Sequence, residues 1–176
     1  MAKGKGGGKL VRAALQFLKK QRKRAGSRNR MSGERLDHQQ RGGITFSKKD
    51  QKLTMTGYHH RPGGVDHAGR RTTDIGDHWD NGVYSGKVEI KNPSPPPPWV
   101  PKLTTDGKST FFPDNWSAER IDNATSDAFR NSTSRNPAKG TWEGYSDGVW
   151  IQGRYDPATG NIGHGFPSGN QQTGRP

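Results

Sequence analysis

Apolar residues in this chain come in short alternating runs that are separated by turn-forming residues. Alternation with a period of two places every second side chain on the same face of a strand, so each run predicts a half-buried β-strand. In residues 82–90, for example, Tyr84, Val88 and Ile90 share one face. The strands are predicted at residues 44–46, 52–58, 82–90, 142–155 and 161–166, with a further short strand within residues 107–117.

Helix signals occur in two places in the body of the chain. Residues 34–38 are expected to end a short helix before Gly42 and Gly43 turn the chain. Ser117 is a good N-cap for a second helix that runs to about Arg130. Short strands with one or two helices predict an α+β fold built on small antiparallel sheets. The inward face of the second helix would consist of Ile121, Ala124 and Ala128.

The connecting segments are rich in turn residues. The sequence Asp-Pro-Ala-Thr-Gly at residues 156–160 predicts a hairpin turn. Four successive prolines at residues 95–98 predict a stiff connector. Residues 131–140 are predicted to be loop.

Composition limits the size of the core. Only 26% of the 176 residues are apolar, while glycine and proline number 25 and 12, so we expect one domain with much loop. The chain has no cysteine, which excludes disulfides and thiolate metal sites. No apolar run approaches the ~20 residues that cross a bilayer. We expect no cleavable signal peptide, since the apolar run at residues 10–18 is broken by Arg12 and Gln16.

The net charge of +13 is concentrated at the N-terminus. Residues 1–30 contain 11 Lys and Arg and no acidic residue, which leaves 18 basic and 16 acidic side chains in the other 146. We therefore divide the chain into a basic, partly disordered arm at residues 1–31, a folded body at 32–168 and a flexible tail at 169–176. Residues 10–24 of the arm predict a short helix. A basic arm of this kind suits a polyanion, either nucleic acid or an anionic membrane surface.

Residues 56–64, Thr-Gly-Tyr-His-His-Arg-Pro-Gly-Gly, combine proton-transfer groups with a phosphate-binding group. Histidine exchanges protons near neutral pH, and arginine binds phosphate with a planar fork. Alternatively, His59 and His60 are surface turn residues. Together with His38 and Lys108, however, the histidines supply what metal-independent RNA cleavage needs: two imidazoles and one fixed cation.

These residues stand in motifs that resemble the EndoU endoribonucleases, in particular the bacterial toxin branch. The resemblance covers roughly residues 32–168. It is carried by a histidine after an acidic residue, a Gly-aromatic-His segment, a Gly-Lys-Ser-Thr-Phe-Phe-Pro segment that leads to Trp-Ser, and a last strand that ends in aromatic-Pro. These motifs lie at residues 37–38, 57–60, 107–117 and 164–167.

The resemblance implies a role for each matched residue. His38 and His59 would form the acid/base pair, with His60 as the alternative second histidine, and Lys108 would contact the phosphate. The family's last motif has a Ser/Thr hydroxyl and often a tyrosine, whereas this chain has His164 and Phe166. The phosphate contact of a tyrosine hydroxyl is therefore absent. The remaining substrate-binding residues are predicted to be Gly57, Arg61, Ser109 and Thr110.

The expected activity is cleavage of single-stranded RNA, with tRNA as one candidate substrate, to a 2′,3′-cyclic phosphate without metal or cofactor. We expect a monomeric toxin, secreted or delivered into the cytoplasm of a target cell and held in check by an acidic immunity protein. Two alternatives remain: a metal-dependent His-Asn-His DNA nuclease, and a basic protein that only binds nucleic acid. His67 and His78 are predicted to be exposed loop residues.

Overall fold

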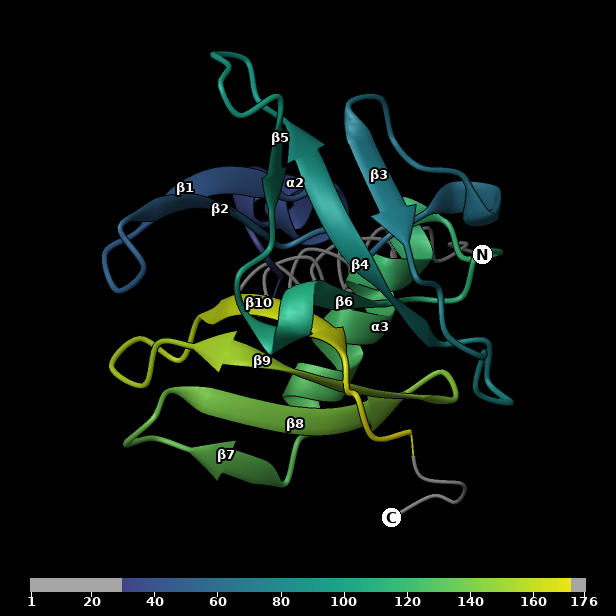
Figure 1. Cartoon of the computed structure of the whole chain (residues 1–176). Coiled ribbons are helices and arrows are strands. Elements are labelled where there is room, and N and C mark those ends of the chain that lie inside the picture. The colour runs from purple at the N-terminus through teal and green to yellow at the C-terminus, as the bar shows by residue number, and fades with distance from the viewer. Residues whose placement is uncertain (1–29, 172–176) are drawn as a thin grey trace, which may run out of the picture.

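The computed structural model describes residues 30–171, which contain two α-helices and ten short strands joined by turns and loops (Figure 1). The strands form three antiparallel sheets, which confirms the predicted α+β class. The predicted arm helix at residues 10–24 lies outside the described residues. Within residues 30–171, no helix has the length and apolar character needed to cross a bilayer.

Helix α2 (Gly33–Arg41) opens the body and leads into a hairpin of β1 (Gly43–Ser47) and β2 (Lys52–Thr56). The Ser32 hydroxyl caps the helix by accepting the Arg35 amide. Gly42, at φ 67°, ends it in a conformation that favours glycine. The helix continues past His38, so this histidine lies inside α2 and not at its end as predicted.

Strand β4 (Tyr84–Lys91) is the centre of the second sheet. It pairs with β3 (Arg70–Thr73) along one edge, and with β5 (Trp99–Pro101) and β6 (Lys108–Phe111) along the other. Short 3₁₀ turns occur at Pro62–Gly64 and Thr105–Gly107. Strand β3 was not predicted, because its four residues are all polar and show no alternation of apolar side chains. Its backbone pairing with β4 is what makes it a strand.

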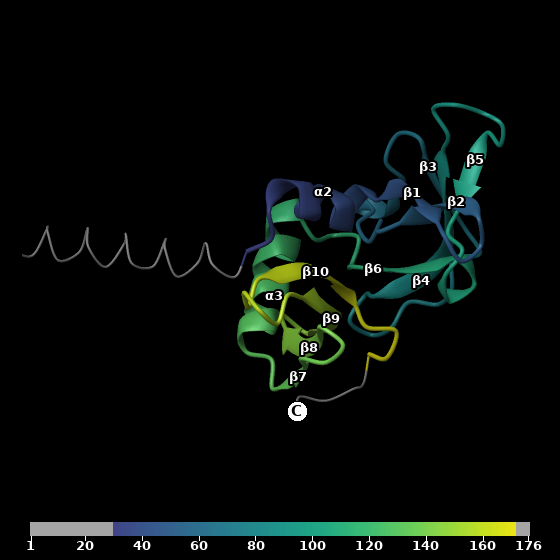
Figure 2. The ribbon, with the colours of Figure 1, turned by 90° about the vertical axis from the view of Figure 1, so that its left-hand side faces the viewer.

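Four strands form the third sheet in the order β10-β9-β8-β7, and α3 (Ala118–Arg130) packs against it (Figure 2). The strands are β7 (Ser134–Asn136), β8 (Thr141–Ser146), β9 (Val149–Tyr155) and β10 (Ile162–Pro167).

Two predictions in this part of the chain are wrong. The run at residues 142–155 is a hairpin, β8 and β9, and not one strand. The chain reverses at Asp147 and Gly148, which both have positive φ, 53° and 83°. Residues 131–140 also contain β7 and are not all loop.

The apolar side chains form two separate cores. One lies between α3 and β8–β10, and the other between β2 and β4–β6. Polar bonds join the two halves. The Gln39 amide, 1% exposed, donates to Thr125 Oγ1 and to the Gly165 carbonyl. Thr110 Oγ1 of β6 donates to the Pro167 carbonyl of β10 at 2.6 Å.

The packing of α3 on β8 leaves no room for a side chain at Gly144. A Cβ there would lie 2.1 Å from the Ala128 carbonyl oxygen, so the helix would have to move. We predict that Gly144→Ala lowers the free energy of unfolding by about 3 kcal/mol, the upper end of typical overpacking costs. Urea denaturation measures this change.

Gly33→Ala is the matched control. Gly33 stands at the start of α2, and a Cβ there meets nothing within 4 Å. This substitution should leave stability unchanged or raise it by up to ~1 kcal/mol, because alanine favours the helix. Equal effects of the two substitutions would contradict the close contact of α3 with β8.

Candidate functional site

A cleft of about 790 Å³ opens between α2, β6 and the β9–β10 hairpin. Its lining comes from both halves of the fold, so the polar bonds that join the halves also fix its width. Most of the predicted site residues contribute to it. Those that line the cleft are His38, Gly57, His59, Lys108, Ser109, Thr110, His164 and Phe166.

Backbone hydrogen bonds bring His38 and His59 to the same place. The Tyr58 amide donates to the His38 carbonyl at 3.3 Å, and the His59 amide donates to the Gln39 carbonyl at 2.8 Å. Gly57 permits this approach. Its φ is 73°, and a Cβ there would lie 2.1 Å from the His38 carbonyl oxygen and 3.0 Å from His38 Nε2.

Hydrogen bonding fixes the tautomer of His59. Its Nδ1 lies 2.7 Å from the Thr110 carbonyl oxygen. A carbonyl only accepts, so Nδ1 carries the proton and Nε2 of the neutral ring is an acceptor.

Three aromatic rings stack along the same wall of the cleft. The His59 ring stacks on Phe166 with centroids 4.9 Å apart, and Phe166 stacks on His164 at 5.7 Å. The stack holds the planes of both imidazoles. Phe166 cannot transfer a proton, but it orients two side chains that can.

Burial keeps all three imidazoles of the cleft neutral. Loss of solvent lowers the pKa of His59 well below its usual 6.5, and the Lys102 charge lowers it further. The same two causes lower the pKa of His38. Burial, followed by the charges of His38 and Arg154, lowers the pKa of His164 to about 4.

Lys102 is the cation of this cluster, and sequence reasoning missed it. Its ammonium donates to Ser109 Oγ at 2.9 Å, and burial lowers its pKa to about 8. Its charge acts on the pKa of His38, His59 and His164. Lys102 stands in no motif; the turn at Thr105–Gly107 and strand β6 bring it beside Ser109.

Lys108 occupies a different part of the cleft. Its side chain is exposed and stands opposite Lys87 of β4. Its charge is felt by Asp74, whose pKa is lowered mainly by a hydrogen bond from Lys87 and to a smaller degree by Lys108. Lys108 therefore lies at the mouth of the cleft, whereas Lys102 lies among the histidines.

The structure does not bring His60 and Arg61 to the cleft. His60 Nε2 lies 2.9 Å from the Trp116 carbonyl oxygen. Arg61 donates to Asp66 at 2.8 Å and to the Tyr84 hydroxyl at 3.0 Å, and only 8% of it is exposed. Arg61 thus stabilises the fold, and the structure offers no support for its predicted contact with substrate.

The remaining two histidines differ from each other. His67 is half-buried and its Nε2 is enclosed, so the prediction that it is exposed is wrong. The exposure predicted for His78 is confirmed, and its ring stacks on Tyr84 with centroids 4.2 Å apart. Within residues 30–171, no three His, Asp or Glu side chains are grouped to hold a metal ion.

The cleft thus combines an acceptor imidazole, a second imidazole and a half-buried cation. A family model described as Bacterial EndoU nuclease matches residues 32–169, more than three quarters of the chain. No curated protein and no solved structure matches the chain.

The low pKa of His164 predicts how stability depends on pH. Between pH 6.5 and about 4 the unfolded chain binds a proton at this residue that the folded protein does not bind. The free energy of unfolding should therefore fall as the pH drops through this window. In His164→Gln this contribution is gone, so the variant should show a flatter curve in urea denaturation across the same window. Parallel curves for the two proteins would contradict the buried, neutral state of His164.

Proposed function

The chain belongs to the bacterial EndoU nuclease family, and we propose that it is an endoribonuclease that cleaves single-stranded RNA, including tRNA. The ribose 2′-oxygen attacks the adjacent phosphorus, and the bond from phosphorus to the 5′-oxygen breaks. The products are a 2′,3′-cyclic phosphate and a 5′-hydroxyl. The observation that carries this proposal is the convergence of His38, His59 and Lys102 in one cleft.

His59 acts as the general base. Because its Nδ1 proton is directed to the Thr110 carbonyl, Nε2 is free to accept the proton of the 2′-hydroxyl. Burial also keeps the ring neutral, which a base requires.

His38 acts as the general acid and gives a proton to the leaving 5′-oxygen. In the free protein its pKa is lowered, first by burial and then by Lys102. A bound phosphate places negative charge beside the ring and raises this pKa again. Substrate binding therefore favours the protonated state that the acid needs.

Lys102 stabilises the charge that develops on the phosphorane oxygens. Its ammonium is held by Ser109 Oγ, which itself donates to the Gly57 carbonyl at 3.1 Å. Lys102 is half-buried, so its charge acts at a lower effective dielectric than it would in bulk water. Lys108, at the mouth, contacts a phosphate of the same RNA strand.

His164 and Phe166 contact the base next to the cleaved bond. The Phe166 ring holds the plane of the His164 imidazole by stacking, and a neutral imidazole has both a donor and an acceptor for the edge of a base. His164 and Phe166 therefore offer a base other hydrogen bonds than the Ser/Thr hydroxyl and the tyrosine of the family's last motif would offer.

The biological role that we propose is that of a monomeric toxin, secreted or delivered into the cytoplasm of a target cell. The support is the resemblance of its motifs to the toxin branch of the family. Such an enzyme endangers the RNA of its producer, so we propose an acidic immunity protein as its partner. The predicted basic arm would add affinity for RNA that depends on salt.

We predict that the protein cleaves an RNA oligonucleotide in EDTA and leaves the all-deoxy oligonucleotide intact, because the nucleophile is the 2′-hydroxyl. His59→Ala and Lys102→Met should each lower the cleavage rate by about 10²-fold or more. Lys108→Ala should have a smaller effect. Single-turnover kinetics with product analysis for the cyclic phosphate measures these outcomes.

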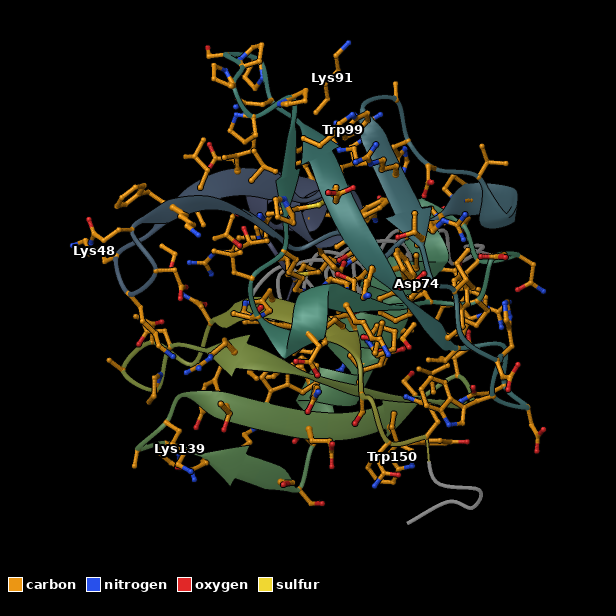
Figure 3. All side chains as sticks on the ribbon, in the orientation of Figure 1. Lys48, Asp74, Lys91, Trp99, Lys139 and Trp150 are labelled. Atoms are coloured by element: carbon orange, nitrogen blue, oxygen red, sulfur yellow. The ribbon has the colours of Figure 1, made fainter. Side chains whose placement is uncertain are left out.

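His78→Ala and Lys48→Met are the matched controls, since both side chains are exposed and outside the cleft; Figure 3 shows Lys48 at the tip of the β1–β2 hairpin. Activity lost in EDTA, or cleavage of DNA, would instead indicate a metal-dependent nuclease. A loss confined to Lys108→Ala, with Lys102→Met active, would return the phosphate contact to the lysine indicated by the sequence motif.

The immunity protein should compete with RNA for the cleft. The cluster of Lys102, Lys108 and Arg154 gives the cleft positive charge, which attracts an acidic protein. We predict that the inhibitor and a non-cleavable RNA analogue exclude each other, and that the association rate of the inhibitor falls as salt rises. Fluorescence anisotropy of the labelled analogue measures the competition. Simultaneous binding of both would show that the inhibitor acts from another surface.

A further inference from the structure

Strand β4 presents one of its faces to solvent. Its Val88 and Ile90 side chains are buried, whereas Lys87 and Lys91 are exposed. Alternation places Ser85, Lys87, Glu89 and Lys91 on the same side of the strand. Together with their cross-strand partners Thr110, Lys108, Arg71 and Trp99, they form what we call the β4 outer face.

The β4 outer face begins inside the cleft. Ser85 pairs with Thr110, and Lys87 pairs with Lys108. Residues that pair directly lie side by side on one face of the sheet. Ser85, Thr110 and Lys108 also line the cleft. A strand of RNA that leaves the cleft at its mouth therefore meets this face next.

The part of the β4 outer face that is nearest to the cleft carries two like charges, Lys87 and Lys108. Lys87 and Lys108 stand directly opposite each other, an arrangement that destabilises a sheet. Asp74 neutralises Lys87 at 2.8 Å. Lys108 forms no ion pair with any residue in the described part of the chain. A phosphate bound between the two lysines would relieve this repulsion.

An aromatic ring and a further cation lie at the far end of the face. Trp99 pairs with Lys91, and Figure 3 shows both near the ends of β4 and β5. The Arg71 guanidinium lies over the Trp99 ring, 4.4 Å from its centroid, and is held there by Glu89. A half-buried indole with a planar guanidinium is a surface on which a base can stack.

Acidic groups reduce the charge of this face but do not reverse it. Asp74 and Glu89 are occupied by Lys87 and Arg71, and Asp106 acts on Lys87 from the turn before β6. Among the residues that the structure describes, Lys91 has no acidic partner. The four cations of the face are Arg71, Lys87, Lys91 and Lys108.

We propose that the β4 outer face is a binding track for single-stranded RNA that continues from the cleft. Phosphates lie against Lys108, Lys87 and Lys91, and a base stacks at Trp99. From Ser85 to Lys91 the track is about 20 Å long at ~3.3 Å per residue. That length corresponds to about six stacked nucleotides at ~3.4 Å each. This inference rests on the proposed function, because it takes the cleft to be the place where RNA is cut.

The test uses two cleavable substrates, a dinucleotide and a 12-nucleotide strand, each with a single ribose at the cleaved position. Trp99→Ala and Lys91→Gln should lower kcat/KM for the long strand, Trp99→Ala by roughly tenfold, within the range of one base–aromatic stack. Neither variant should change cleavage of the dinucleotide, which is too short to reach Trp99. Both should also weaken binding of a 2′-O-methyl 12-mer, measured by fluorescence anisotropy.

One matched control comes from strand β9, and the other comes from the turn between β7 and β8. Trp150→Ala and Lys139→Gln change the same residue types away from the track (Figure 3) and should leave the preference for the long strand unchanged. Binding of the 12-mer that is equal in wild type, Trp99→Ala and Lys91→Gln would overturn the track and leave this face to a protein partner. A wild-type protein that binds the 12-mer through Trp99 but cuts neither substrate would keep the track and overturn the proposed function.

Discussion

The geometry of the cleft depends on two backbone hydrogen bonds at the end of α2. The last carbonyls of a helix have no partner within the helix. Here the Gln39 carbonyl accepts the amide of His59, and the His38 carbonyl, which also accepts the Gly42 amide at the end of the helix, accepts the amide of Tyr58. His38 belongs to α2, and His59 belongs to the segment after β2. These two hydrogen bonds join the two segments and therefore set the distance between the imidazoles through the backbone. Gly57 is required next to them, because any larger residue would meet the helix.

Electrostatics in the cleft follows from how many ionisable groups are buried together. Three imidazoles and one ammonium share the site, and low dielectric makes more than one positive charge costly. The protein resolves this by leaving the charge on Lys102 and keeping the histidines neutral. An anionic substrate changes the balance, since its phosphate favours a second positive charge. In the mechanism that we propose, substrate binding would thus form the general acid, in a site where burial sets the charge of the free protein.

Local signals predicted much of the fold, and long-range contacts decided the rest. The Ser117 cap and the inward face of α3 are local and were predicted correctly. The turn at Asp147 was also signalled, because Asp-Gly is a typical hairpin pair, but the apolar alternation on both sides concealed it. The positions of the Lys102 and Arg61 side chains depend on partners that are distant in the sequence or set by the fold. Spacing alone cannot show that Ser109 draws one cation into the cleft, or that Asp66 draws the other away from it.

Strand β10 connects the packing of the core to the chemistry of the cleft. Residues two apart in a strand share a face, so His164 and Phe166 point to the cleft while Gly165 points to the core. A Cβ at Gly165 would lie 2.6 Å from the Thr125 side chain and 2.9 Å from the Trp142 ring. This close approach fixes the height and the register of β10 above α3. The ring of Phe166 then has one position, and by stacking it fixes the plane of the His59 imidazole on the other half of the fold. Phe166 needs no hydroxyl for this role, because the role depends only on a rigid aromatic ring that the core holds in place.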